Sequence, residues 1–133
     1  MTHHVFTYGS LMFAPVWERV VRGRYRSAAA RLDGHARFAL SDDTYPGMVP
    51  VPGSTVAGVL YFDVDPDDLV TLDHFEGAEY RRTPIEVRLD AARVLSAQTY
   101  LFDAPGRLST RPWNPDTFPI ARFLDSYCRD KLG

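Results

Sequence analysis

Residues 65–77, DPDDLVTLDHFEG, have the clearest start and end signals of any helix that the sequence predicts. Asp65 suits the N-cap, Pro66 suits the first turn, and Asp68 occupies the position from which a side chain reaches back to the cap. Gly77 suits the end, because glycine readily adopts the left-handed conformation in which many helices end. The apolar residues follow at three-residue steps: Leu69, Leu72 and Phe75. The pattern therefore predicts a helix with one face turned to a core.

Strands are predicted on both sides of this helix. Before it, residues 55–64 are nearly all apolar and β-prone, which is typical of a central strand buried on both faces. After it, residues 83–89 alternate between apolar and polar side chains, which is the period of a half-buried strand. Residues 94–102 have the composition of a further strand.

The N-terminal part of the chain predicts a strand, a helix and a hairpin. Residues 5–8 form a short β-branched and aromatic strand that Gly9 stops, and a helix runs from Pro15 to Gly23. Two strands, residues 25–32 and 35–40, are then joined through the hairpin dipeptide Asp33-Gly34.

Two loops and a last helix complete the prediction. Residues 41–54 are rich in proline and glycine, so we expect a loop held in extended conformations. Residues 103–115 form a second loop around Trp113, and a helix follows from about Thr117. Its apolar stripe consists of Ile120, Phe123, Leu124 and Tyr127. Strands outnumber helices and pair mainly with neighbours, which favours a curled sheet or barrel with helices outside, in a single domain of residues 1–133.

Composition limits the classes of function. The 133 residues are 45% hydrophobic and 13% aromatic, enough for a core without disulfides or a metal. The one cysteine, Cys128, favours a reducing, cytoplasmic setting. A net charge of -2 gives no reason to expect nucleic acid or an anionic membrane as a partner. No apolar run approaches the roughly 20 residues of a membrane span, and residues 1–4 lack the features of a signal peptide.

The first loop, Tyr8-Gly9-Ser10-Leu11-Met12, is one candidate site. A glycine directly after a strand lets a row of backbone N–H groups approach a carboxylate or an oxyanion. An ordinary strand-to-helix turn explains the same residues. Ser10 as a nucleophile is disfavoured, because the nucleophile elbow needs glycines where this chain has Tyr8 and Met12.

Glu76 is the second candidate. It falls on the last turn of its helix, where the negative end of the helix dipole opposes a carboxylate, and Asp73 lies one turn earlier. Together with partial burial, these features raise a carboxyl pKa toward the range that acid/base catalysis needs. The alternative is a solvated glutamate that pairs with Arg81 or Arg82.

Other sites are not supported by the pattern. Residues 63–74 begin like a calcium loop but lack its glycine and its last glutamate. The histidines show no zinc-ligand spacing, and Cys128 lies in the apolar stripe of the last helix, where a core role is expected. We therefore expect neither a metal nor a cofactor.

Taken together, the two candidate motifs carry a family resemblance. Residues 5–11, VFTYGSL, resemble the tyrosine-glycine-serine loop of γ-glutamylcyclotransferase-like proteins, which include the plant avirulence-induced-gene-like group. Residues 72–77, LDHFEG, followed by Tyr80 and Arg82, resemble the family's second signature, which contains its catalytic glutamate. Residues 45–47 and 58–61 resemble its middle segment, and the order and spacing cover residues 5–102.

The resemblance implies an α+β fold, a small mixed and mostly antiparallel β-barrel with flanking helices. It also implies an enzyme that cyclises a γ-glutamyl amine, amino acid or peptide to 5-oxoproline and releases the amine. Glu76 is then the catalytic acid and base. The substrate-binding residues are Tyr8, Gly9, Ser10, Leu11, Tyr45, Tyr80 and Tyr100. The alternative is a non-catalytic module of the same fold that binds a small molecule.

Two structural expectations follow. The loop from Tyr8 to Leu11 and Glu76 should line one pocket, although more than 60 residues of sequence separate them. The N–H groups near Gly9 and Ser10 should be free to hold an anion or a carboxylate. Nothing in the sequence decides the oligomeric state, and a monomer is plausible.

Overall fold

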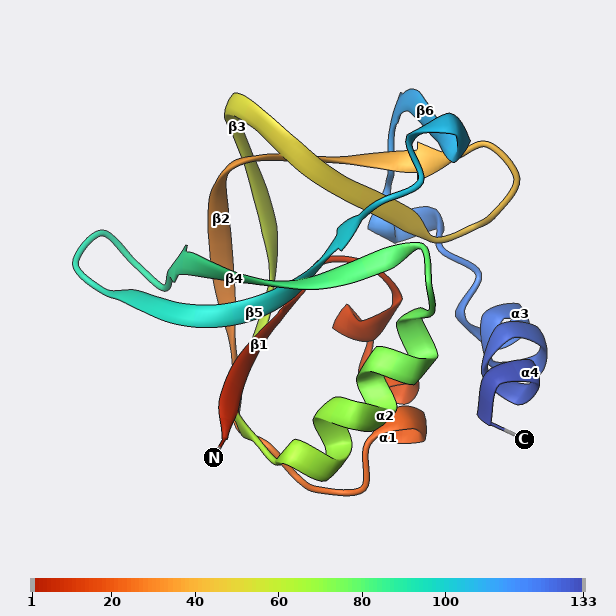
Figure 1. The fold of residues 1–133 in the computed structure, drawn as a ribbon, viewed down its shortest axis with the longest axis horizontal. Coiled ribbons are helices and arrows are strands. Elements are labelled where there is room, and N and C mark those ends of the chain that lie inside the picture. The colour runs from red at the N-terminus through yellow and green to blue at the C-terminus, as the bar shows by residue number, and fades with distance from the viewer. Residues whose placement is uncertain (1, 133) are drawn as a thin grey trace.

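The computed structural model describes residues 2–132, so Met1 and Gly133 of the predicted 1–133 domain lie outside the described residues. The order of the larger elements is β1 (His3–Thr7), α1 (Ala14–Val20), β2 (Ser27–Leu40), β3 (Pro46–Val64), α2 (Pro66–Glu76), β4 (Tyr80–Arg88), β5 (Val94–Phe102), β6 (Leu108–Pro112) and a last helix (Figure 1). Short 3-10 turns cover Ser10–Met12 (η1), Pro105–Arg107 (η2) and Pro115–Thr117 (η3). The last helix consists of α3 (Ile120–Phe123), a π-helical segment η4 (Leu124–Cys128) and α4 (Arg129–Leu132).

Five strands close into a barrel. The order around the ring is β3-β1-β5-β4-β2, and β2 pairs with β3 again to close it. The pair β1–β5 is parallel and the other pairs are antiparallel, so the predicted small mixed barrel with flanking helices is confirmed. β6 extends β2 at one end, outside the closed ring.

The predicted hairpin at Asp33-Gly34 is wrong. β2 and β3 are long strands that pair along nearly their whole length, and the chain turns between them at residues 41–45. The register steps from Asp33↔Thr55 to His35↔Pro50, so residues 51–54 of β3 face Gly34 alone. Gly34 and Gly53 have φ of 77° and 85°, which favour glycine at this bend of the ribbon.

Other differences concern proline and burial. The predicted loop at 41–54 and the loop at 103–115 both contain strand residues, because β3 begins at Pro46 and β6 occupies Leu108–Pro112. Proline lacks an N–H but does not prevent pairing where a strand is irregular, as at Pro50 beside the bulge. Residues 55–64 do form a strand, but not one buried on both faces, since Thr55 and Ala57 are exposed.

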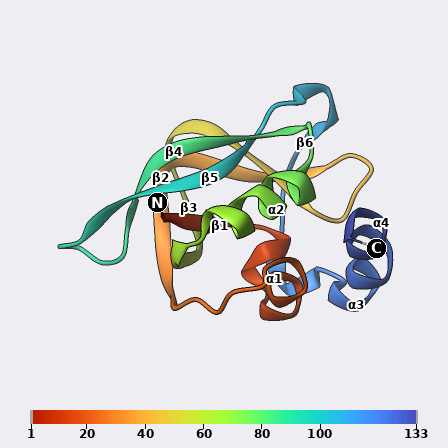
Figure 2. The same ribbon diagram turned by 60° about the horizontal axis from the view of Figure 1, so that its bottom comes forward.

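The helix at 66–76 is confirmed, with Asp65 at its N-cap position and Gly77 at positive φ after it. Asp68 does not reach back to the cap. Its buried carboxylate instead accepts hydrogen bonds from the N–H groups of Arg22 and Gly23 (2.9 Å each) and from the Tyr25 hydroxyl (2.6 Å). These bonds tie the segment after α1 to α2. The two helices contact each other and lie below the barrel in Figure 1, and the turned view of Figure 2 brings them forward.

The core has two parts. One fills the barrel around Phe6, Leu60 and Val87, and the other packs the helices against the sheet around Val64, Leu72 and Phe75. Cys128 is fully buried in the second part, as expected of a core residue. Gly58 is required where β3 passes β1, because a Cβ there would lie 2.1 Å from the Thr7 carbonyl oxygen.

Candidate active site

One pocket gathers every site residue that the sequence predicted. Its space of about 430 Å³, including its open mouth, lies where the loop after β1, the end of α2 and strands β4 and β5 meet. The predicted residues on its lining are Tyr8, Gly9, Ser10, Leu11, Tyr45, Glu76, Tyr80 and Tyr100. The expectation that the loop and Glu76 share one pocket is therefore confirmed, while the roles of these residues stay predictions.

The loop after β1 is held by bonds from three other strands. The Arg37 guanidinium of β2 donates to the Tyr8 carbonyl (2.7 Å), and the Thr7 hydroxyl donates to the Val59 carbonyl of β3 (2.8 Å). The Tyr8 hydroxyl donates to the Tyr100 carbonyl of β5 (2.5 Å). This part of the lining is thus fixed before any ligand arrives.

Gly9 is required by close packing. A Cβ at this position would lie 2.9 Å from both Cγ and Cδ of Pro46, the first residue of β3. Any larger residue would push the loop and β3 apart and widen the pocket between them.

The predicted anion site at the loop stays a prediction, but it requires that the N–H groups near Gly9 and Ser10 are not all paired within the main chain. Among residues 2–132, the loop's own hydrogen bonds run from the Met12 N–H to the Gly9 carbonyl (3.0 Å) and from the Phe13 N–H to the Ser10 carbonyl (3.2 Å). Neither bond uses the N–H groups of Gly9, Ser10 or Leu11. Backbone donors that remain free beside a pocket suit a carboxylate or an oxyanion.

Ser10 lacks the partner that a nucleophile needs. It is buried on the pocket lining, and within the described chain none of the hydrogen bonds of a histidine reaches its hydroxyl. A serine hydroxyl without an adjacent base stays protonated and is a weak nucleophile. The geometry thus agrees with the sequence pattern, which disfavours a serine hydrolase.

Glu76 is the last residue of α2; it is half-buried and lines the pocket. Burial raises the pKa of Glu76 to about 8; the charge of Lys131 opposes this rise and the charge of Asp73 adds to it. Within residues 2–132, the Arg82 guanidinium pairs with Asp73 (3.0 Å) and not with Glu76. The alternative was a solvated glutamate paired with Arg81 or Arg82, and within residues 2–132 Glu76 forms an ion pair with neither arginine.

Three tyrosines that line the pocket with Glu76 are neutral hydrogen-bonding groups. Tyr80 donates to the Pro46 carbonyl (2.7 Å) and Tyr100 donates to the Asp73 carboxylate (2.6 Å). Burial raises the pKa of both phenols well above their usual range, and it raises the pKa of Tyr45 to about 12. All three are therefore neutral donors at pH 7.

Sequence reasoning missed a second wall of the pocket. It consists of Pro46, Phe123 and Tyr127, with Phe75 beside them. The Tyr127 ring packs edge-on against Tyr45 and Phe75, with ring centroids 5.1 Å apart in each case, and stacks on Phe123 at 5.0 Å. The apolar stripe of the last helix was the available signal, but a stripe does not say which cavity it borders.

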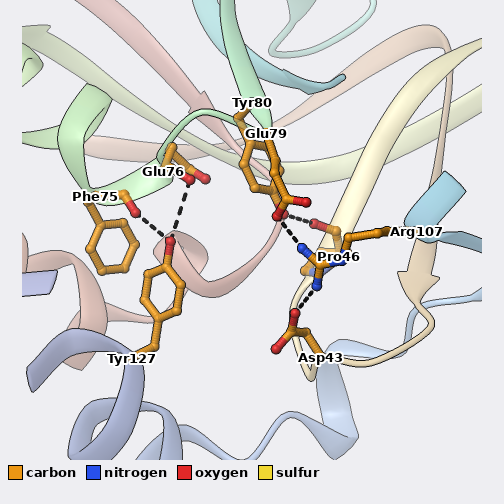
Figure 3. Close-up of polar contacts among 8 residues, drawn as sticks. All are labelled: Asp43, Pro46, Phe75, Glu76, Glu79, Tyr80, Arg107 and Tyr127. Carbon is orange, nitrogen blue, oxygen red and sulfur yellow. Dashed lines mark hydrogen bonds and ion pairs between the residues drawn. The ribbon is translucent and has the colours of Figure 1, made fainter. Parts of the chain in front are cut away.

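A group of polar contacts holds the segment that carries Tyr45, which we call the strap (residues 41–46). Arg107 forms ion pairs with Asp43 of the strap and with Glu79, three residues after Glu76 (Figure 3). The Trp113 indole donates to the Thr44 carbonyl (2.7 Å). The strap is thus tied to the turn after β5, to the segment after β6 and to the segment that follows Glu76.

The described residues offer no group of three or more histidine, cysteine or acidic side chains that would hold a metal ion. None of the helices in the described part of the chain is long and apolar enough to cross a membrane. The pocket lining thus combines a carboxyl group whose pKa is raised to about 8, the backbone N–H groups of the loop after β1, and neutral phenols. Such a set can hold a carboxylate-bearing molecule and move a proton on it.

Comparison with known proteins gives a consistent result. A family model described as γ-glutamyl cyclotransferase, AIG2-like, matches residues 5–116. AIG2-like protein D of Arabidopsis thaliana is 33% identical over 102 residues, which span 75% of this chain and 67% of that protein. AIG2-like protein A of the same plant is 34% identical over 101 residues, which span 75% of this chain and 61% of that protein.

Solved structures share the fold. An Arabidopsis thaliana protein determined in solution is 28% identical and has a TM-score of 0.72, over 94% of this chain and 87% of that one. A γ-glutamyl cyclotransferase has a TM-score of 0.70, over 98% of this chain and 80% of that one. At 17% identity, this second likeness is evidence of the fold alone.

Proposed function

Because the chain belongs to the γ-glutamyl cyclotransferase, AIG2-like family, we propose that it cyclises a γ-glutamyl amine, amino acid or peptide to 5-oxoproline with release of the amine. Family membership supports the cyclotransferase type of reaction. The observation that carries the proposal to this chain is Glu76, a carboxyl group with a pKa of about 8 that lines the same pocket as the loop of Gly9, Ser10 and Leu11.

The reaction needs little from the protein beyond positioning and proton transfer. The substrate's own α-amine attacks its γ-carbonyl carbon, a C–N bond forms in a five-membered ring, and the bond to the leaving amine breaks. Nucleophile and electrophile belong to one molecule, and holding them in an attack geometry is worth an effective molarity of about 10⁵ M or more. Neither a covalent enzyme intermediate nor a water molecule enters the balance of this reaction.

Glu76 supplies the proton transfer in this proposal. As a carboxylate it takes a proton from the substrate's α-ammonium group, and as a carboxylic acid it returns that proton to the departing nitrogen. A pKa of about 8 suits both steps, since at pH 7 about a tenth of the groups are ionised and the acid form gives its proton readily. A carboxyl group with an ordinary pKa would be a poor proton donor at that pH.

In this proposal the loop after β1 binds the anionic groups of the substrate. The free N–H groups of Gly9, Ser10 and Leu11 suit either the substrate's α-carboxylate or the oxyanion that forms on the γ-carbonyl. The neutral phenols of Tyr80 and Tyr100 complete the polar lining without adding a charge. Together they fix the substrate while Glu76 moves the proton.

The test is a panel of γ-glutamyl compounds with 5-oxoproline as the measured product. The panel contains a γ-glutamyl amine, a γ-glutamyl amino acid and glutathione, each at several concentrations. Formation of 5-oxoproline with an equal amount of released amine supports the proposal. Binding of these compounds without 5-oxoproline supports the alternative, a binding module of the same fold.

A serine-directed phosphonate distinguishes the remaining alternative, a serine hydrolase that uses Ser10, from the proposed cyclase. We expect it to leave 5-oxoproline formation intact, because Ser10 lacks a base. Inactivation with one phosphonate bound per chain at Ser10 would instead support a serine hydrolase.

A further inference from the structure

The last helix, residues 120–132, borders the pocket although it lies after residue 116, where the family match ends. Phe123 and Tyr127 form part of the pocket wall, and α4 contacts α2. The helix packs beside the end of α2 that carries Glu76. The helix is therefore close enough to influence the position and the charge of Glu76, the proposed proton carrier.

Tyr127 fixes the backbone at Glu76. Its hydroxyl donates to the Phe75 carbonyl (2.6 Å) and lies 3.4 Å from the Glu76 carbonyl oxygen (Figure 3). Both carbonyls belong to the last turn of α2, where backbone acceptors have no partner within the helix. The Tyr127 ring is packed by aromatic neighbours, so the hydroxyl has little freedom to leave this position.

Lys131 follows one turn later and brings a positive charge to the same place. Its Nζ lies 5.5 Å from the centroid of the Tyr127 ring, and it would lie 3.0 Å from a Cβ at Gly77. The ammonium group is thus next to the residue that follows Glu76, at the negative end of the α2 dipole. Lys131 is the one lysine in the sequence.

The charges that act on Glu76 come from two helices. Lys131 of α4 lowers the pKa of Glu76 and Asp73 of α2 raises it, while Arg82 of β4 pairs with Asp73. The hydroxyl groups that face Glu76 are those of Tyr8, Tyr80, Tyr100 and Tyr127. Burial raises the pKa of all four phenols, so they are neutral at pH 7. Lys131 is therefore the cation that offsets the effect of Asp73 on Glu76.

We propose that the 120–132 helix is a working part of the active site, in which Tyr127 and Lys131 are positioning residues: Tyr127 holds the backbone at Glu76, and Lys131 sets a positive charge beside it. The kinetic consequences rest on the proposed cyclisation. The placement of Lys131 beside a titrating Glu76 does not, and it can be measured without any substrate.

The kinetic test compares variants of one helix. Lys131→Met should lower kcat/KM at pH 7 about threefold to tenfold and move the rise of activity to higher pH, because the carboxylate loses its cation. Lys131→Arg should restore most of the activity. Arg129→Met is the matched control, since it removes one cation from an exposed position of the same helix and should leave activity unchanged.

Tyr127→Phe removes the hydroxyl but keeps the ring packing. We expect kcat to fall on the order of tenfold with KM within about twofold, because Glu76 is displaced while the substrate pocket remains. Normal kcat and an unchanged pH profile in both Tyr127→Phe and Lys131→Met would overturn the proposal.

The substrate-free test uses the single lysine as a reporter. Reductive ¹³C-methylation keeps the charge of Lys131 and gives one lysine resonance beside that of the α-amine. In the wild type this resonance should shift with an inflection at about pH 8, the pKa of Glu76. The inflection should persist in Glu86→Gln, an exposed control, and disappear in Glu76→Gln.

The outcomes separate the two claims. An inflection that survives Glu76→Gln, or no inflection in the wild type, contradicts the placement of Lys131. An inflection that depends on Glu76, in a protein that cyclises none of the panel, refutes the proposed function while it supports this inference.

Discussion

The two walls of the pocket differ in how the chain builds them. One wall, the loop after β1 and the end of α2, comes from two short contiguous stretches, residues 8–11 and 72–77. The other, the strap and the 120–132 helix, is assembled by contacts between segments far apart in the sequence, such as those of Arg107 and Tyr127. In the proposed mechanism the first wall carries the chemistry and the second wall holds its geometry. Variants of the first wall should therefore lower mainly kcat, and variants that loosen the strap of the second wall should raise mainly KM.

The largest effect is expected on the first wall, at Glu76. Glu76→Gln keeps the size of the side chain but cannot accept or give a proton, so turnover should fall on the order of 10²-fold or more while substrate binding weakens little. Glu86→Gln, an exposed glutamate of β4, is the control and should leave turnover unchanged. Near-normal 5-oxoproline formation by Glu76→Gln would remove Glu76 from the mechanism.

Gly9→Ala tests the contact between the two walls. The added methyl group would meet Pro46 at 2.9 Å, so the loop and the start of β3 must separate. We expect kcat/KM to fall on the order of tenfold and stability to fall by about 1–3 kcal/mol, as overpacking does. Gly106→Ala adds the same group where no atom lies within 4 Å, and it should change neither quantity. Equal behaviour of the two variants would show that the Gly9 contact does not matter.

Arg107→Met tests the second wall. It leaves the carboxylates of Asp43 and Glu79 without their shared cation and frees the strap that carries Tyr45. We expect KM to rise about threefold to tenfold with a smaller change in kcat, because the wall loosens while Glu76 keeps its surroundings. Arg88→Met breaks a comparable exposed pair with Asp33 away from the pocket, and it should leave KM unchanged. A kcat loss as large as that of Glu76→Gln would contradict the division between the walls.

The smallest effect concerns stability. A carboxyl group whose pKa is raised from 4.5 to about 8 on folding contributes stability below about pH 4.5, which is lost as pH rises through about 8. Glu76→Gln removes this loss, so its melting temperature should match the wild type near pH 5 and exceed it increasingly toward pH 8. Because the residue is partly exposed, we expect a gain on the order of 1–2 kcal/mol, well below the full value for such a shift. A constant difference across this pH range would argue against a raised pKa.

The first wall was predictable from the sequence because its signals are local. Helix punctuation at Asp65, Pro66 and Gly77 places Glu76 on a last turn, and a glycine after a strand marks the binding loop. The resemblance then joined the two motifs, which no local rule connects. Tyr45, Tyr80 and Tyr100 were placed by that resemblance, and all of them lie on the pocket.

Apart from Tyr45, the second wall was not predictable from the sequence, for physical reasons. The sequence predicts a loop over residues 41–54, because prolines weaken the strand signal. Long-range pairing with β2 overrides this, and β3 begins at Pro46. Asp68 is a second example. The local sequence places it at a capping position, but it bonds to Arg22, Gly23 and Tyr25, which are distant in sequence. Tyr127 stood in an apolar stripe, and a stripe indicates burial without naming the cavity.

The central claim is that Glu76 carries the proton, and a direct titration of its carboxyl carbon tests it. Comparison of ¹³C spectra of the wild type and Glu76→Gln identifies the Glu76 resonance, which is then followed from pH 4 to pH 10 beside the pH profile of kcat/KM. We expect a midpoint at about pH 8 and a kcat/KM that rises with the same midpoint. A Glu76 midpoint near the ordinary value of 4.5, with activity that does not follow it, would contradict the account.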